Sequence, residues 1–74
     1  MSNYERRVYL ARVRDFVDGV SFPATREEIL AHARRRNTPS DIYADLTHLP
    51  DRRFDSLADV VAAVQELRFA SAAR

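Results

Sequence analysis

The sequence predicts a mainly α-helical, single small domain of four short helices, with at most a two-strand β bridge between residues 20–22 and 52–54. Three observations predict it. Four helix-start signatures divide the chain, and apolar residues recur at steps of three and four after each signature. In addition, VSFPATREEIL and RRFDSLADVV repeat one phrase, in which a short extended segment leads into a capped helix.

Each predicted helix begins with a hydroxyl side chain that is followed three residues later by an acid, the spacing of a capping box. The hydroxyl accepts a hydrogen bond from the first turn, and the acid complements the positive end of the helix dipole. The four pairs are Ser2 with Glu5, Thr25 with Glu28, Thr38 with Asp41, and Ser56 with Asp59. Pro39 supports the third start, because proline is preferred at the first helical position.

Apolar residues form one stripe on each predicted helix, and we expect these stripes to build the core. In chain order they are Tyr9, Val13, Phe16, Val17 and Val20; Ile29, Leu30 and Ala33; Ile42, Leu46 and Leu49, with Tyr43 flanking; and Leu57, Val60, Val61, Val64 and Leu67. On the first helix, Arg7, Arg14 and Asp18 fall on the opposite side.

Glycine, asparagine and proline mark the predicted helix ends. Gly19 ends the first helix, Asn37 the second and Pro50 the third. Pro23 keeps Phe22 out of the helical region, which predicts an extended segment there. We expect Phe22 and Phe54 to plug the ends of the helices that follow them.

Length and composition predict one domain over residues 1–74, because 74 residues leave no room for two. The chain has no cysteine and no apolar run long enough for a signal peptide or a membrane span, so we expect a cytoplasmic protein. Residues 1–36 carry eight arginines and five acids, whereas residues 41–59 carry two arginines and five aspartates. This two-sided charge suits docking to a charged partner or to a second copy, and equally suits a solubilising surface.

The segments PATREEILAHARRR and LPDRRFDSLADVVAAV resemble the bacterial domain of unknown function 2795 family, whose pattern is close to FPA-[ST]-K-E-E-L and then L-P-D-R-x-[FY]-x-S-x-x-D-V. The resemblance covers about residues 20–67, leaving the helix of residues 1–19 and the tail of residues 68–74 outside. Arg26 replaces the expected lysine, and Asn37-Thr38 stands where a glycine is common. The matching residues are Phe22, Pro23, Ala24, Thr25, Glu27, Glu28, Leu49, Pro50, Asp51, Arg52, Phe54, Ser56, Asp59 and Val60. The resemblance implies a fold and no catalytic residues.

Catalysis is not expected. The chain has no cysteine nucleophile, no GxSxG elbow and no phosphate-binding glycine loop. A thin core also leaves little room for a ligand pocket, so we expect neither a cofactor nor a small-molecule substrate.

Phosphate binding is the alternative function. The second and third helices follow each other as in a helix-turn-helix, and two clusters, Arg34–Arg35–Arg36 and Arg52–Arg53, are candidate phosphate contacts. Arginines in a last helical turn also complement the helix dipole, which explains the first cluster without nucleic acid. The would-be reading helix carries acids rather than bases, which disfavours sequence-specific binding.

Asp41, Asp45 and His48 share one face of the third helix, a spacing that allows a weak divalent site, but a solvated polar face is the favoured interpretation. The calcium-loop pattern is missing, and His32 lies on another helix.

A protein interface is the favoured prediction. Tyr4 and Val8 lie off the main stripe of the first helix, and Phe69 lies beyond the stripe of the fourth. Exposed, these residues form a seam for a partner or a homodimer; buried, Tyr4 and Phe69 close the ends of the core. We therefore expect a non-catalytic interaction or regulatory module with a protein partner or a second copy.

Overall fold

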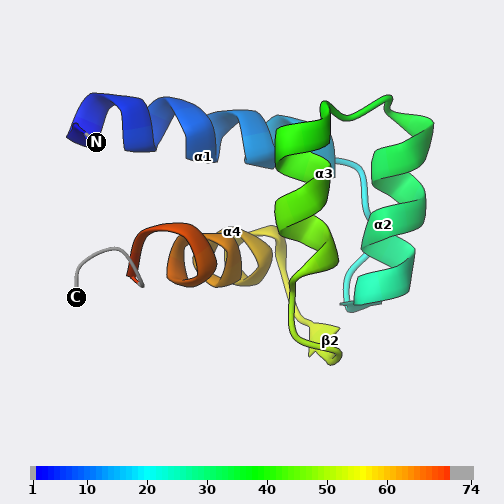
Figure 1. Cartoon of the computed structure of the whole chain (residues 1–74). Helices are drawn as coiled ribbons and strands as arrows, with labels where there is room; N and C mark the ends of the chain where they lie inside the picture. The colour runs from blue at the N-terminus through cyan, green and yellow to red at the C-terminus, as the bar shows by residue number, and fades with distance from the viewer. Residues whose placement is uncertain (1, 71–74) are drawn as a thin grey trace.

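The computed structural model describes residues 2–70. The elements are α1 (Asn3–Val17), β1 (Ala24–Thr25), α2 (Arg26–Arg35), α3 (Ser40–Thr47), β2 (Arg53–Phe54), α4 (Leu57–Gln65) and a π-helical turn, η1 (Glu66–Ala70). The predicted mainly α fold with four helices and a two-strand bridge is therefore confirmed. Figure 1 shows α2 and α3 side by side at one end, with α1 and α4 extending from them one above the other. Within residues 2–70, no helix has the length and apolar character needed to cross a membrane.

Three of the four predicted caps form as expected. Ser2 with Glu5 and Thr25 with Glu28 make complete capping boxes, each with both reciprocal hydrogen bonds. The hydrogen bond from the Thr25 backbone N–H lowers the pKa of Glu28. Ser56 accepts a hydrogen bond from the Asp59 N–H at the start of α4.

The predicted cap at Thr38 is wrong. Pro39 is the residue that precedes α3, and no side chain caps this helix. Thr38 instead closes the end of α2, because its hydroxyl and its backbone N–H both donate to the Ala33 carbonyl, at 2.8 and 3.2 Å. Asn37 turns the chain with a φ of 54°, and this turn brings Thr38 back to the Ala33 carbonyl, which also accepts from the Arg36 N–H at 3.2 Å. The hydroxyl therefore serves the C-terminal end of α2 and not the start of α3.

The first strand of the bridge begins at residue 24, four residues later than predicted. Ala24 pairs with Phe54 and Thr25 with Arg53 in antiparallel register, so residues 53–54 are correct and residues 20–22 are not. The Val20 N–H donates to the Val17 carbonyl at 3.2 Å and thus completes the turn at the end of α1. Pro23 has no N–H to offer a ladder. Pairing begins at the first residue after it.

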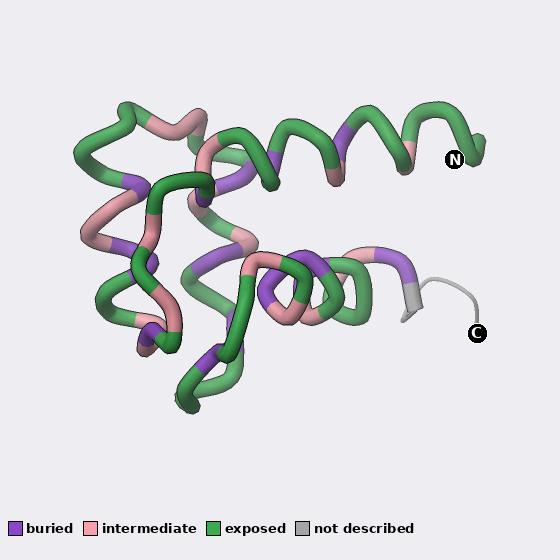
Figure 2. Tube along the Cα trace, turned by 180° about the vertical axis from the view of Figure 1, so that it is seen from behind, coloured by how far each residue is buried: buried purple, intermediate pink, exposed green. Residues whose placement is uncertain are grey.

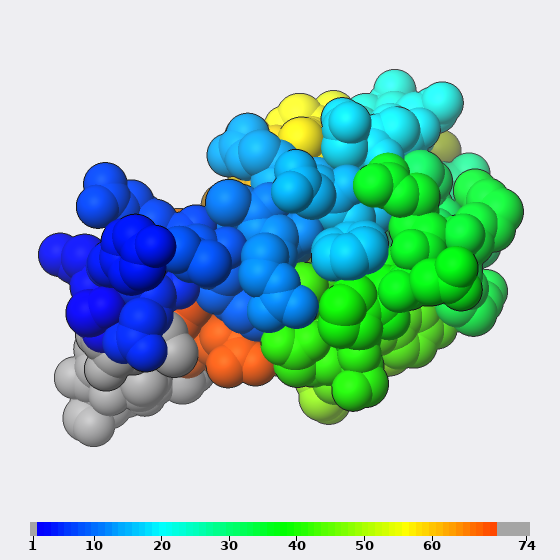
Figure 3. All heavy atoms as spheres, turned by 90° about the horizontal axis from the view of Figure 1, so that it is seen from above, coloured from blue at the N-terminus to red at the C-terminus, as the bar shows by residue number. Residues whose placement is uncertain are grey.

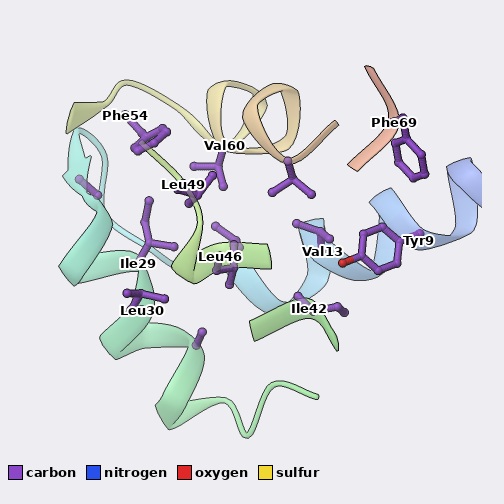
Figure 4. Close-up of a cluster of buried hydrophobic side chains, with 14 residues drawn as sticks. Tyr9, Val13, Ile29, Leu30, Ile42, Leu46, Leu49, Phe54, Val60 and Phe69 are labelled. Carbon is purple, nitrogen blue, oxygen red and sulfur yellow. The ribbon is translucent and has the colours of Figure 1, made fainter. Parts of the chain in front are cut away.

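The core is one apolar cluster enclosed by all four helices and the bridge (Figure 4). Most of the predicted stripe residues are buried in it, and among the described residues no polar or charged residue is buried. Phe54 is fully buried, and Phe22 is partly buried and packs against the core. In Figure 2 the buried positions follow the inward sides of the helices, whereas most of α1 is exposed.

The end of the fourth stripe differs from the prediction. Leu67 is 37% exposed, and Phe69, at 7%, takes its place in the core. The reason is η1, because a π-helical turn closes hydrogen bonds to the fifth residue rather than the fourth. Counting from the buried Val64, the wider turn presents the fifth residue, Phe69, to the core.

Gly19 ends α1 in a conformation that suits only glycine, with a φ of 101°. A Cβ at this position would also stand 3.1 Å from Cε1 of His32. The close approach lets His32 Nε2 reach the Asp18 carbonyl oxygen at 2.8 Å. This contact fastens the loop after α1 to α2.

Candidate interaction surface

The outward side of α1 carries three apolar residues in one line. Tyr4, Val8 and Ala11 follow each other at steps of four and three, which places them on one face of the helix. We call this set the outer stripe. Tyr4 is 70% exposed and Val8 43% exposed. Figure 3 looks down onto α1, drawn in blue, which shares this face of the molecule with the green α3 region. Of the two alternatives left open by the sequence, the exposed one holds for Tyr4 and Val8.

Beside the outer stripe is an open hollow of about 300 Å³ with mainly apolar walls. Its lining residues all belong to α1: Tyr4, Glu5, Val8, Tyr9 and Arg12. The hollow is at the low end of the volume range of ligand pockets and is open to solvent, so it suits one inserted side chain better than an enclosed ligand.

The floor of the hollow is held by a polar contact that joins three elements. The Tyr9 hydroxyl donates to Asp45 Oδ2 on α3, and Arg68 Nε of η1 donates to the same oxygen at 2.8 Å. The Arg68 guanidinium also lies over the Tyr9 ring, 4.3 Å from its centroid. Burial and the hydrogen bond to Asp45 raise the pKa of Tyr9 to about 12. Tyr9 is therefore a neutral, fixed phenol at ordinary pH.

Sequence reasoning missed this contact, because it placed Asp45 on a polar face. Its position held a usable signal: Asp45 stands three residues after Ile42 and four before Leu49, beside the buried stripe. A carboxylate at such a position needs a partner, but nothing in the local sequence names Tyr9 and Arg68 as that partner.

Arginines flank the outer stripe. Arg7 and Arg14 lie along one side, seven residues apart and both exposed, and Arg12 lies on the other. Arg12 pairs with Asp41 at 3.5 Å. Within residues 2–70, no ion pair involves Arg7 or Arg14. The exposed Asp15 and Asp18 stand next to Arg14 and four residues after it, so the outward face combines exposed apolar surface with charges of both signs.

Phe69 is not part of this surface. Its ring packs edge-on against Tyr9, with centroids 6.2 Å apart, and the Arg6 guanidinium lies 4.9 Å from its centroid (Figure 4 shows the two rings). Of the two alternatives for Phe69, the buried one holds, because the π-helical turn directs the ring inward. Phe69 closes the core, whereas Tyr4 does not.

The three arginines of the first cluster, at the C-terminal end of α2, have different neighbours. Arg34 donates to the Tyr43 hydroxyl at 2.8 Å, and Arg36 donates to the Asp18 carbonyl at 3.0 Å. Arg35 borders a second hollow, of about 280 Å³, whose walls carry both acidic and basic groups: Gly19, Val20, Ser21, Glu28, Ala31, His32 and Arg35. The three guanidinium groups do not form one patch.

The second cluster lies at the other end of the same helix. Arg53 pairs with Thr25, the residue just before α2, so about 14 Å of helix separates it from the first cluster. Arg52 binds both carboxylate oxygens of Asp59, at 3.1 and 3.2 Å, and this contact lowers the pKa of Asp59. The guanidinium of Arg52 also lies 4.2 Å from the centroid of the Phe54 ring. The structure does not bring the two clusters together.

The three side chains considered for a divalent ion have separate surroundings. Asp41 pairs with Arg12, Asp45 binds Tyr9 and Arg68, and His48 is exposed at the end of α3. Across residues 2–70, no three His, Cys, Asp or Glu side chains are grouped as metal ligands.

One family model matches the chain, over residues 10–61, and the family is described as a protein of unknown function (DUF2795). The match begins inside α1 and ends inside α4, so it is shifted toward the N-terminus relative to the expected residues 20–67. Tyr4 and Val8 precede it. No curated protein and no solved structure matches the chain. Because the match covers well over half of the sequence, the chain belongs to the DUF2795 family.

Proposed function

We propose that this protein is a non-catalytic interaction module that docks a protein partner on the outward face of α1. The observation that carries the proposal is the exposure of Tyr4 and Val8 side by side along a hollow with apolar walls. When a partner covers a large apolar side chain that a rigid helix leaves in water, the burial lowers the free energy of the complex. The patch is small, which suits a transient complex rather than a permanent one.

The contacts on the inner face of α1 favour a role in docking, and not in folding, for the outer stripe. The inner face of α1 already buries Tyr9, Val13 and Val17, so the outer stripe contributes nothing to the core. The polar contact among Tyr9, Asp45 and Arg68 fixes the floor of the hollow to α3 and η1. A fixed surface binds without the entropic cost of first becoming ordered.

The non-catalytic part of the proposal rests on how the reactive groups are engaged. His32 binds a backbone carbonyl, Asp45 binds a cation and a phenol, and Asp59 binds Arg52. His32 and Ser21 border the same hollow, but within residues 2–70 no hydrogen bond joins the imidazole to a hydroxyl, as a nucleophile and its base would require.

The experiment is site-specific photocrosslinking in the cells that produce the protein, with p-benzoylphenylalanine replacing Val8. A matched variant carries the same group in place of Thr47, which is exposed on α3. We expect a discrete protein adduct from position 8 and none from position 47. Excess unmodified protein should compete the adduct away, and a Tyr4→Ser competitor should do so less well. Equal labelling from both positions, or none from position 8, would contradict the proposal.

Phosphate binding through the arginine clusters is the competing proposal. It needs Arg34, Arg35 and Arg36 to act with Arg52 and Arg53, although these groups lie at opposite ends of α2. Fluorescence anisotropy with labelled duplex and single-stranded DNA at low and high salt decides it. Binding that weakens steeply with salt would favour this proposal over protein docking.

A further inference from the structure

We infer that η1 is a conformational switch with two helical registers, which bury Phe69 in one register and Leu67 in the other. This inference goes beyond the proposed function and does not depend on a docked partner. Three observations carry it: the π-helical turn itself, an apolar side chain that this turn leaves in solvent, and a polar contact that holds the turn in place.

The second register is the plain α-helical continuation of α4. Residues three, four and seven apart share a face of an α-helix. In that register Leu67 lies in line with Val60 and Val64, which are both fully buried. Phe69 lies in line with Ala62, seven residues before it, which is exposed. An uninterrupted α-helix therefore places Leu67 inward and Phe69 outward, the reverse of the arrangement in the structure.

Apolar burial does not separate the two registers strongly. In the π-helical register Phe69 is 7% exposed and Leu67 is 37% exposed. A change of register exposes one large apolar side chain and buries another, so the two burial contributions largely cancel. The backbone favours the α register, because π-helical turns are rare and occur mostly as single turns, frequently at functional sites. Another contact has to hold η1 in the register that the structure shows.

That contact is made by Arg68. Its Nε donates to Asp45 Oδ2 at 2.8 Å, and its guanidinium lies 4.3 Å from the centroid of the Tyr9 ring. The Phe69 ring packs edge-on against the same tyrosine (Figure 4). A change of register withdraws Phe69 from Tyr9 and alters the reach of Arg68, so the charge-assisted hydrogen bond favours the π-helical register. With this bond intact, the α register is a minor state of roughly a few tenths of a percent.

The switch acts on the hollow of α1, because Tyr9 is one of its lining residues. In the π-helical register, Phe69 and Arg68 flank the tyrosine ring and fix the floor of the hollow. In the α register the ring loses its edge-on neighbour, and Phe69 moves to the exposed side of α4. One change of hydrogen-bond register thus loosens the hollow and displays a second aromatic side chain.

The test is NMR relaxation dispersion on the full chain, with isotope labels in the leucine methyl groups and the phenylalanine rings. Asp45→Asn removes the charge that holds Arg68, and we expect it to raise the population of the second register about tenfold. Leu67 and Phe69 should then report one shared exchange rate. The matched control is Asp41→Asn, whose carboxylate pairs with Arg12, and it should leave the exchange as in the natural sequence.

A second variant separates a change of register from general loosening. Leu67→Ser leaves the α register without a large apolar side chain to bury, while its effect on the π-helical register is small because position 67 is exposed. Added to Asp45→Asn, it should abolish the exchange at the Phe69 ring. Exchange that persists in this double variant overturns the inference. So does equal exchange in Asp45→Asn and Asp41→Asn, exchange at only one of the two side chains, or none in Asp45→Asn.

Discussion

Tyr4 and Tyr9 stand five residues apart on the same helix, and their surroundings are opposite. Tyr4 is 70% exposed, with its ring on the outward face beside Val8. Tyr9 is 9% exposed, its hydroxyl bonded to Asp45, its ring covered by Arg68 and edge-on to Phe69. Other segments of the chain satisfy every part of the inner tyrosine, whereas the outer one is left to solvent.

The arginines on the two faces of α1 differ in the same way: some are paired inside the fold and others are exposed. Arg68 shares one carboxylate oxygen with Tyr9, so its charge is compensated inside the fold. Arg7 and Arg14 have no such partner in the part of the chain that the structure describes. One face of α1 is thus tied into the fold and the other is exposed, so substitutions on the two faces should have different effects.

The largest expected effect is at the inner face. Phe69→Ala should lower the free energy of unfolding by about 3–5 kcal/mol, because it empties the space against Tyr9. The matched control, Leu67→Ala, should cost less than about 1 kcal/mol, since Leu67 is more than a third exposed. Urea denaturation of both variants measures this. Equal losses of unfolding free energy in the two variants would mean that the π-helical turn does not place Phe69 in the core in preference to Leu67.

Next is the polar contact beneath the hollow. Asp45→Ala should cost about 2 kcal/mol, because it leaves the Tyr9 hydroxyl and the Arg68 guanidinium without their shared acceptor. Asp41→Ala removes only an exposed ion pair with Arg12 and should cost about 0.5 kcal/mol or less. Thermal melts of the two variants compare them. If Asp41→Ala is the more damaging, the roles assigned to the two aspartates are reversed.

The same contact predicts a loss of stability in alkali. The pKa of Tyr9 is raised from 10.0 to about 12, so between these values the folded state keeps a proton that the unfolded state has released. The free energy of unfolding is therefore constant with respect to this group below pH 10 and falls as the pH rises from 10 to 12. Tyr9→Phe should lack this particular decline. Chemical denaturation at stepped pH measures both proteins, and identical alkaline profiles would contradict the assignment.

The smallest effect on stability is expected at the outer face. Tyr4→Ser with Val8→Ser should change the free energy of unfolding by no more than about 0.5 kcal/mol, because neither side chain packs in the core. Placed in the competition assay, this variant should fail to displace the adduct formed at position 8. A strongly destabilised variant would show that the outer face is part of the fold after all.

The candidate surface was only partly predictable. Tyr4 and Val8 fall off the periodic stripe of α1, and Arg7 and Arg14 fall opposite it, so a helical repeat alone places all four outward. The inward turn of Phe69 was not predictable, because a π-helical turn follows from packing around η1 and has no local signature in the sequence. The hollow also depends on Tyr9, whose position is fixed by two distant elements.

The sequence by itself determined the four helices, three of their caps and most of the core stripes, because each depends on contacts between residues three or four apart. Ser2 with Glu5 and Thr25 with Glu28 would cap a helix in almost any surroundings. Only the tertiary structure decided where Thr38 donates, where the bridge begins and which side chain ends the fourth stripe. In each case a group had more than one available partner. The arrangement of the helices, which no local pattern contains, made the choice.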